Sequence, residues 1–386
     1  MEQILHLQWQ GKYGLDNKKY GKWRVSWQSN VIKEVGGYYL NGLKQGLWKE
    51  LYKNYQTSDA KVFEFGEYYN DLKRSKWNYI YKNKKIGGGL QNIEGLKKGK
   101  WTELSENFCY DSQVIYNGEY NKKGMKVGIW DIMYCVVEEN QYKQIGGGLY
   151  HCSLGIKIGK WVELWDSFYL YSQACYKGHY NMKGMKVGRW DIMFCDNYEK
   201  EYQQIGGGSY DDSFGSKIGQ WVELDEGFYA DKQVTYDGKY NLNGIKVGNW
   251  ITKYCKFHEK EYKQIGGGSY DSFQGFKIGR WIELDQGFYE GKQITYNGEY
   301  NINGIKVGRW DIMLCHKYGK EYQQIGGGQY DNYSGRKIGQ WVELDEELQG
   351  WNYITYSGKY NMNGKKVGKW RKIDLRSNNN FGKYEI

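Results

Sequence analysis

Glycine triplets are the first residues of this sequence that could do chemistry, as in QIGGGSYDSFQGFKIGRW (264–281), where Gly266–Gly268 come together. A glycine-rich loop can bind phosphate, but a phosphate loop ends in Gly-Lys-Ser/Thr and opens a helix. Here Ser-Tyr-Asp and a second turn follow, and the triplet recurs at 87–89, 146–148, 206–208 and 326–328. A nucleotide site repeated five times is implausible, so the triplets predict places where rings or backbones approach closely.

A column of glutamates could be interpreted as paired acid–base groups. Each lies in the motif Trp-x-Glu-Leu, and the members are Glu103, Glu163, Glu223, Glu283 and Glu343. Acid–base catalysis needs carboxyl groups whose environments differ, so that their pKa values separate. A strict repeat gives each carboxylate the same environment. The column therefore predicts a solvated or lysine-paired face and no enzyme.

The cysteines and histidines do not indicate a metal or cofactor site. The seven cysteines are odd in number and never spaced as C-x-x-C, which is typical of free thiols in a reducing compartment. Four of them recur every 60 residues, and a single sheet would place these about 19 Å apart, beyond disulfide reach. We expect small, half-buried residues at Cys135, Cys195, Cys255 and Cys315. No ligand spacing links His6, His151, His179, His258 and His316.

Lysine forms the one column with a candidate binding role, two residues before a repeated glycine. In a meander these lysines would lie about 10 Å apart, close to one Debye length, so their charges would add into a positive stripe. Anionic lipid or acidic protein tails would fit it, whereas nucleic acid is disfavoured because no reader module is present. The alternative is that they solubilise the sheet and pair with the glutamates. The column comprises Lys97, Lys126, Lys157, Lys186, Lys217, Lys246, Lys277, Lys306, Lys337 and Lys366.

These columns exist because the chain is an internal repeat. Each 60-residue unit holds two related halves, such as GGGSYDSFQGFKIGRWIEL (266–284) and YNGEYNINGIKVGRWDIML (296–314). Closing tryptophans mark thirteen half-units that use nearly all of residues 11–373 and leave no room for a separate catalytic domain. The repeated structural positions are Gly268, Tyr270, Gly275, Gly279 and Trp281 in one half, and Gly238, Tyr240, Gly244, Gly248 and Trp250 in the other.

Each half-unit is predicted to be a β-hairpin, because Asn-Gly pairs such as Asn243-Gly244 favour tight turns. A two-residue turn would put Tyr240 opposite Val247, with Tyr240 and Trp250 on opposite faces. A large ring beside a glycine can also lie over its backbone. Consecutive hairpins predict an all-β, elongated antiparallel meander of about 26 strands in a single twisted sheet. A closed β-solenoid with 60-residue coils is the alternative.

Composition agrees with an all-β chain: 54 glycines, 40 tyrosines, 17 tryptophans and no proline among 386 residues. The formal net charge is +10. The N-terminus lacks the basic and apolar regions of a secretory signal, and no run of 18 apolar residues occurs. We therefore expect a cytoplasmic protein without a transmembrane segment.

The stretch YDGKYNLNGIKVGNW (236–250) resembles the MORN repeat (membrane occupation and recognition nexus). The departure is that Trp250 stands where the usual repeat has a second glycine, so the units match a variant, G-x-Y…G-x-K-x-G-x-W. Residues 1–84 are a degenerate version, residues 85–373 hold five 60-residue double hairpins, and 374–386 form a cap or tail. The resemblance implies elongated sheets that act as scaffolds, often at membranes or at cytoskeletal or ciliary structures.

The expected function is a non-enzymatic scaffold that binds other proteins, with cytoskeletal partners implied by the resemblance. The first alternative is peripheral binding of anionic phospholipid through the lysine column. A carbohydrate- or choline-binding wall module is disfavoured by the missing signal and the unpaired cysteines. An enzyme would need a site in the irregular first 84 residues, where no catalytic constellation is recognisable.

Overall fold

The computed structural model describes residues 6–53, 55, 60–136, 141–195, 201–257, 259–315, 321–345 and 354–374, and the backbone of 380–385. His258, His316 and residues 375–379 and 386 of the expected C-terminal cap lie outside this set. Two compact units divide the chain. The N-terminal unit comprises Met1–Val187 with Met193–Tyr202, and the C-terminal unit comprises Gly188–Ile192 with Gln203–Ile386.

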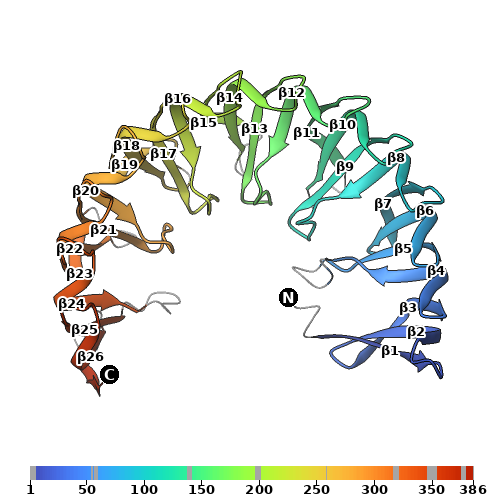
Figure 1. Cartoon of the computed structure of the whole chain (residues 1–386), viewed down its shortest axis with the longest axis horizontal. Helices are drawn as coiled ribbons and strands as arrows, with labels where there is room; N and C mark the ends of the chain where they lie inside the picture. Colours follow the sequence, from blue (N-terminus) through green and yellow to red (C-terminus); the bar gives the residue numbers. More distant parts are fainter. Residues whose placement is uncertain are drawn as a thin grey trace. The chain divides into compact units, whose positions relative to one another are not determined.

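Almost all of the regular structure is β-strand (Figure 1). The strands of the N-terminal unit are β1 (Leu7–Tyr13), β2 (Lys19–Trp27), β3 (Asn30–Leu40), β4 (Leu43–Leu51), β5 (Val62–Tyr69), β6 (Leu72–Tyr81), β7 (Lys84–Gln91), β8 (Lys97–Leu104), β9 (Gln113–Tyr120), β10 (Lys126–Cys135), β11 (Tyr142–Tyr150), β12 (Lys157–Leu164) and β13 (Gln173–Tyr180). The boundary between the units falls within β14 (Lys186–Cys195). The strands of the C-terminal unit are β15 (Gln203–Tyr210), β16 (Lys217–Leu224), β17 (Gln233–Tyr240), β18 (Lys246–Cys255), β19 (Lys263–Tyr270), β20 (Lys277–Leu284), β21 (Gln293–Tyr300), β22 (Lys306–Cys315), β23 (Gln323–Tyr330), β24 (Lys337–Leu344), β25 (Ile354–Tyr360), β26 (Lys366–Asp374) and β27 (Asn380–Glu385).

Within each unit every strand pairs antiparallel with the next one in sequence. The ladders run from β1 to β13 in the N-terminal unit and from β15 to β27 in the C-terminal unit. The described strands close no ring in either unit. The meander of tandem hairpins in an open sheet is therefore confirmed, and the closed solenoid is not the fold.

The predicted two-residue turn at Asn243-Gly244 is wrong. Tyr240 pairs with Lys246, which leaves a longer connection, and the Gly244 amide donates to the Asn241 carbonyl oxygen at 3.1 Å. The Asn241 side-chain oxygen accepts from the amides of Asn243 and Ile245 at 2.9 and 3.0 Å, so Asn241 holds the turn as an Asx turn does. A two-residue turn does occur at Asn41-Gly42, where both φ angles are positive and Leu40 pairs with Leu43.

The expectation that Tyr240 and Trp250 occupy opposite faces is also wrong, because Tyr240 pairs with Lys246 instead of Val247. The ladder steps from Lys239–Val247 to Asp237–Ile251, and Gly248 has a φ of +64°. This bulge at Gly248 adds two residues, an even number, so it leaves Trp250 on the face of Tyr240 and Lys246. The two rings lie 5.3 Å apart at 90°, and the Lys246 ammonium lies 4.0 Å from the Trp250 ring centroid.

Tryptophan rings lie directly over glycines of the neighbouring strand, which confirms the close approach expected of them. A Cβ atom added to Gly268 would lie 2.3 Å from the ring of Trp281, and one added to Gly238 would lie 2.2 Å from Trp250. Both tryptophans are buried. The triplets are thus places where rings and backbones meet.

The rings form the main core as a ladder of edge-to-face contacts. In the C-terminal unit they alternate Trp and Tyr from Trp190 to Trp370, with successive centroids 5.0–6.4 Å apart. Edge-to-face geometry is the arrangement that aromatic quadrupoles favour. The sheet is therefore stabilised by one layer of rings instead of a second sheet.

A second core lies under the loops that follow β8, β12, β16 and β20. Each loop buries one phenylalanine of a 60-residue series that the motif analysis missed: Phe108, Phe168, Phe228 and Phe288. Phe288 packs with Val234 and Tyr254. Consecutive loops also bond to each other, since the amide of Leu170 donates to Asp111 and that of Glu290 to Asp231, at 2.9 and 2.8 Å.

Candidate functional site

The lysine and glutamate columns meet on the aromatic face. Glu223 on β16 forms ion pairs with Lys217 and, at 2.9 Å, with Lys246. The Tyr240 hydroxyl donates a hydrogen bond to the same carboxylate at 2.7 Å. The Glu223 side chain is only 13% exposed. The register explains the cluster, because Gly219 pairs with Tyr240, and Tyr240 in turn pairs with Lys246.

This cluster recurs five times and uses every lysine of the predicted column. The pairs are Lys97 and Lys126 with Glu103, Lys157 and Lys186 with Glu163, Lys217 and Lys246 with Glu223, Lys277 and Lys306 with Glu283, and Lys337 and Lys366 with Glu343. The lysine side chains are 28–37% exposed. Each carboxylate neutralises one of the two lysine charges in its cluster, which halves the positive charge expected of the stripe. The predicted lysine-paired glutamate face is confirmed.

The electrostatics of these carboxyl groups are uniform. Burial by itself would raise the pKa of Glu223, but Lys246 and Lys217 outweigh it and hold that pKa below its ordinary value. The pKa values of Glu103, Glu163, Glu283 and Glu343 are lowered with the same opposing causes. Burial and the hydrogen bond to Glu223 raise the pKa of Tyr240. All five carboxylates are therefore ionised at neutral pH.

One member of this arrangement was missed in the degenerate N-terminal part. Glu50 pairs with Lys44 and accepts from the Tyr68 hydroxyl at 2.7 Å. The motif Trp-x-Glu-Leu at 48–51 is the signal that would have found it.

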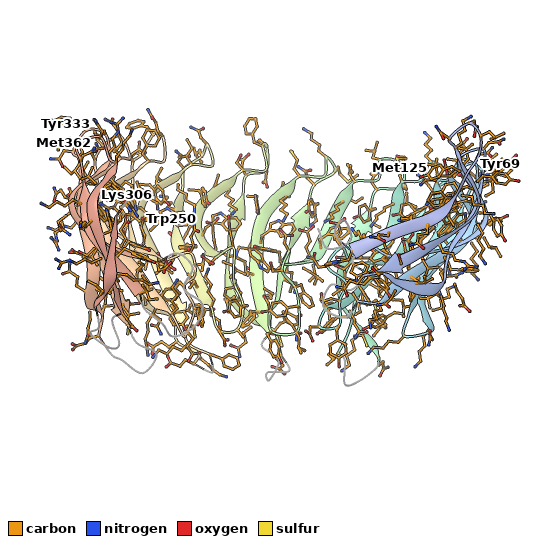
Figure 2. All side chains as sticks on the ribbon, turned by 90° about the horizontal axis from the view of Figure 1, so that it is seen from below. Tyr69, Met125, Trp250, Lys306, Tyr333 and Met362 are labelled. Carbon is orange, nitrogen blue, oxygen red and sulfur yellow. The ribbon has the colours of Figure 1, made fainter. Side chains whose placement is uncertain are left out.

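Each unit has a groove over these columns. The groove of the C-terminal unit has a volume of about 1230 Å³ and is lined by Lys246, Tyr270, Lys277, Glu283 and Lys306, among others. A groove of about 700 Å³ in the N-terminal unit is lined by the equivalent Lys97, Glu103, Lys126 and Lys157. Figure 2 shows Trp250 and Lys306 on the strands of the C-terminal unit, away from the hairpin tips. The grooves offer aromatic edges and partly neutralised cations.

The hairpin tips carry a second surface that sequence reasoning missed. In the C-terminal unit six large apolar side chains are 72–88% exposed at the turns after β15, β17, β19, β21, β23 and β25. These turns share one edge of the sheet, and Figure 2 shows Tyr333 and Met362 there. The signal was an apolar residue between Asn or Asp and the turn glycine. We name these residues the tip row: Phe214, Leu242, Phe273, Ile302, Tyr333 and Met362.

The remaining predicted positions contribute to turns, bulges or the core. Gly275 occupies a turn with a φ of +74°, Gly279 lies at a bulge, and Tyr270 packs edge-on against Trp281 at 5.0 Å. Cys135, Cys195, Cys255 and Cys315 are buried, more deeply than the half-buried state expected.

The described residues contain no group of three His, Cys, Asp or Glu side chains that come together as a metal site would need. No helix in the same residues is long and apolar enough to cross a bilayer.

Comparison with known proteins adds no relative. No model of a protein family matches the chain, and no curated protein sequence matches it.

Proposed function

We propose that this chain is a non-enzymatic repeat scaffold that binds other proteins, and that the tip row is the surface that binds them. The observation that carries this proposal is the exposure of six large apolar side chains at successive turns, where turn positions are usually polar. Contiguous exposed apolar surface is typical of protein-interaction sites. Successive tips are two strands apart, or about 10 Å, so an elongated partner would meet several at once.

The repeat itself supports a binding role over a catalytic one. Five glutamate clusters share the same partners and the same direction of pKa shift. Enzymes separate the pKa values of an acid and a base. The resemblance to MORN repeats is what favours a cytoskeletal or ciliary partner.

The test is affinity purification from the native cell with the wild-type chain and a tip-row variant, in which the six residues are replaced by Ser or Asn. We expect the tip-row variant to lose the partners that the wild type retains. A matched variant at polar tip neighbours, Asp212→Asn with Gln274→Ser, should keep them. Partners retained by the tip-row variant would refute the assignment of this surface.

A second candidate function is binding of anionic phospholipid through the lysine column. The column's ten lysines outnumber its five glutamates two to one, which leaves one net positive charge in each lysine–glutamate cluster. Flotation with phosphatidylserine vesicles at low and physiological salt tests this function. Salt-sensitive flotation that is lost when Lys217, Lys246, Lys277 and Lys306 become Gln would favour it, and no flotation at low salt would exclude it.

A further inference from the structure

Among the ladders described within the two units, the one between β2 and β3 has an enlarged bulge. At β10 and β11 the ladder runs from Asp131–Gly147 through Ile132–Gly146 to Met133–Gln144 and skips one residue. At β2 and β3 it steps from Arg24–Gly36 to Val25–Ile32 and leaves three residues unpaired, Lys33 to Val35. Val35 is buried, while Glu34 has a φ of +66°, a conformation uncommon for residues with side chains. Such outliers often mark functional sites.

Cations without carboxylate partners gather beside this bulge. Lys22, Arg24 and Lys33 form no ion pair with any described residue, in contrast to the paired lysine column. The position of Arg24 is acidic in three later hairpins, where Asp131, Asp191 and Asp311 follow the tryptophan, and it is Asn78, Ile251 or Arg371 in the other hairpins of this half. At the N-terminal bulge the basic residue lines the pocket together with Lys22 and Lys33.

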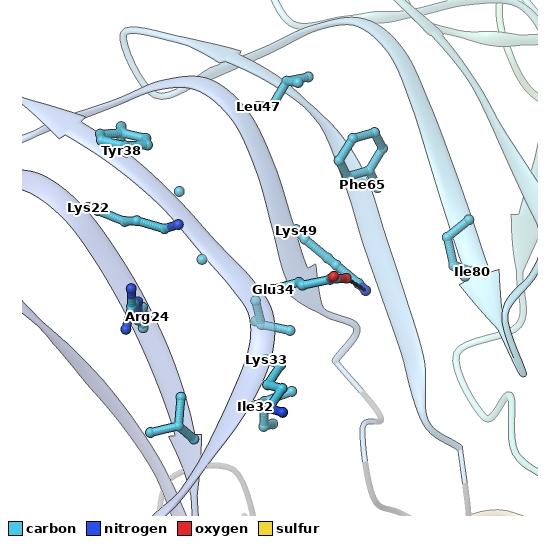
Figure 3. A pocket seen from close by; sticks show the side chains of 14 residues that line it. Lys22, Arg24, Ile32, Lys33, Glu34, Tyr38, Leu47, Lys49, Phe65 and Ile80 are labelled. Carbon is cyan, nitrogen blue, oxygen red and sulfur yellow. Dashed lines mark ion pairs between the residues drawn. The ribbon is translucent and has the colours of Figure 1, made fainter.

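An apolar wall faces these cations across a pocket of about 600 Å³, a size typical of small-molecule sites. Figure 3 shows Lys22 and Arg24 on one side, Leu47 and Phe65 on the other, and the Lys49–Glu34 ion pair below Phe65. Leu47 is 65% exposed and Phe65 is 38% exposed. Strands β2 to β6 supply the lining, so the ladder of the sheet holds both walls.

We infer that this N-terminal pocket binds a small amphipathic anion. Its phosphate or carboxylate contacts Lys22, Arg24 and Lys33, and its aliphatic or aromatic body packs on Leu47, Phe65 and Tyr38. Charge-assisted hydrogen bonds to the cations orient the ligand, and burial of its apolar body supplies further affinity. This site is distinct from the tip row and from the lysine column.

The Glu34 carboxylate lines the same pocket, where it repels an incoming anion and pairs with Lys49. The carboxylate lies 3.7 Å from the Lys49 ammonium, and the Glu34 side chain is 83% exposed. An exposed pair of this kind is weak, so an incoming anion can displace it. Removal of the Glu34 charge therefore strengthens binding, a gain that damage to the fold would not produce.

Calorimetric titration of the full chain with octyl phosphate, below its micelle concentration, tests the inference. We expect one molecule bound per chain, at least about tenfold more tightly than inorganic phosphate or 1-octanol, because each of these lacks one half of the ligand. Sodium octanoate, titrated in parallel, tells whether the site prefers a carboxylate or a phosphate.

Three variants locate the site. Lys22→Gln with Arg24→Gln should weaken binding about tenfold or more, and Glu34→Gln should strengthen it. The charge-matched control, Lys100→Gln with Lys239→Gln, removes two exposed lysines elsewhere and should leave binding unchanged. No binding to the wild type, equal affinity in the Lys22 and Arg24 variant, or about five molecules bound per chain would overturn the inference, the last by assigning binding to the lysine column.

Discussion

Replacing Gly238 by alanine tests whether position 238 requires glycine because the ring of Trp250 lies over its backbone. The new Cβ would lie 2.2 Å from that ring, whereas carbon atoms in contact keep about 3.5–4 Å, so the ring would have to move by more than about 1 Å. Trp250 packs edge-on against Tyr240 and Tyr270, at 5.3 and 6.0 Å. Overpacking costs about 1–3 kcal/mol and each lost aromatic pair about 0.5–1.5 kcal/mol. We expect a destabilisation of about 3 kcal/mol.

Gly248→Ala in the same hairpin is the matched control. Its Cβ would meet nothing within 4 Å, so the cost is that of a φ of +64° alone, about 1–2 kcal/mol. A repeat array can open locally, so the assay is native-state hydrogen exchange on the amides of β17 and β18, which gives the free energy of local opening. An equal or larger loss for Gly248→Ala would refute the ring-contact explanation.

Three further predictions concern the paired glutamates, the cysteines and the phenylalanines of the loops. The lowered pKa values of the five glutamates stabilise the folded state, fully so above the ordinary value of 4.5. This stability is lost as the pH falls through the depressed pKa values. The urea midpoint of unfolding should therefore fall in acid, and it should fall less in Glu223→Gln. A midpoint that stays constant down to pH 3 would contradict this. Ellman's reagent should modify the exposed Cys152 first, because burial raises the pKa of Cys175 to about 12 and that of Cys255 to about 11; equal rates for all seven thiols would contradict their burial. Phe288→Ala should destabilise the protein by about 3–5 kcal/mol in urea unfolding, and a loss below 1 kcal/mol would show that the loops add no core.

The fold could be predicted because each half-unit contains the sequence pattern of a β-hairpin. Glycine between two aromatic strands signals a turn, and the 60-residue period extends that turn into a meander. The register could not be predicted, since it depends on the Asn241 side chain that holds the turn and on the bulge at Gly248. Neither feature changes the pattern of apolar residues, and the longer turn, which pairs Tyr240 with Lys246, is the one that reverses the predicted faces.

The candidate surfaces were predicted less completely. The lysine column could be read from its spacing, and its pairing with glutamate was one of the two alternatives that spacing left open. The tip row was missed because the turn sequence indicates the type of turn but not how far its side chains are exposed. The N-terminal pocket was missed because its enlarged bulge departs from the repeat, and a repeat pattern predicts only the register that the units share.

The most direct test of the central claim is quantitative proximity labelling in the native cell. It compares the wild-type chain, the tip-row variant and the variant in which Lys217, Lys246, Lys277 and Lys306 become Gln. The account predicts a set of proteins that the wild type and the lysine variant label equally and the tip-row variant does not. Labelling that survives in the tip-row variant, or that is lost only with the lysines, would contradict it.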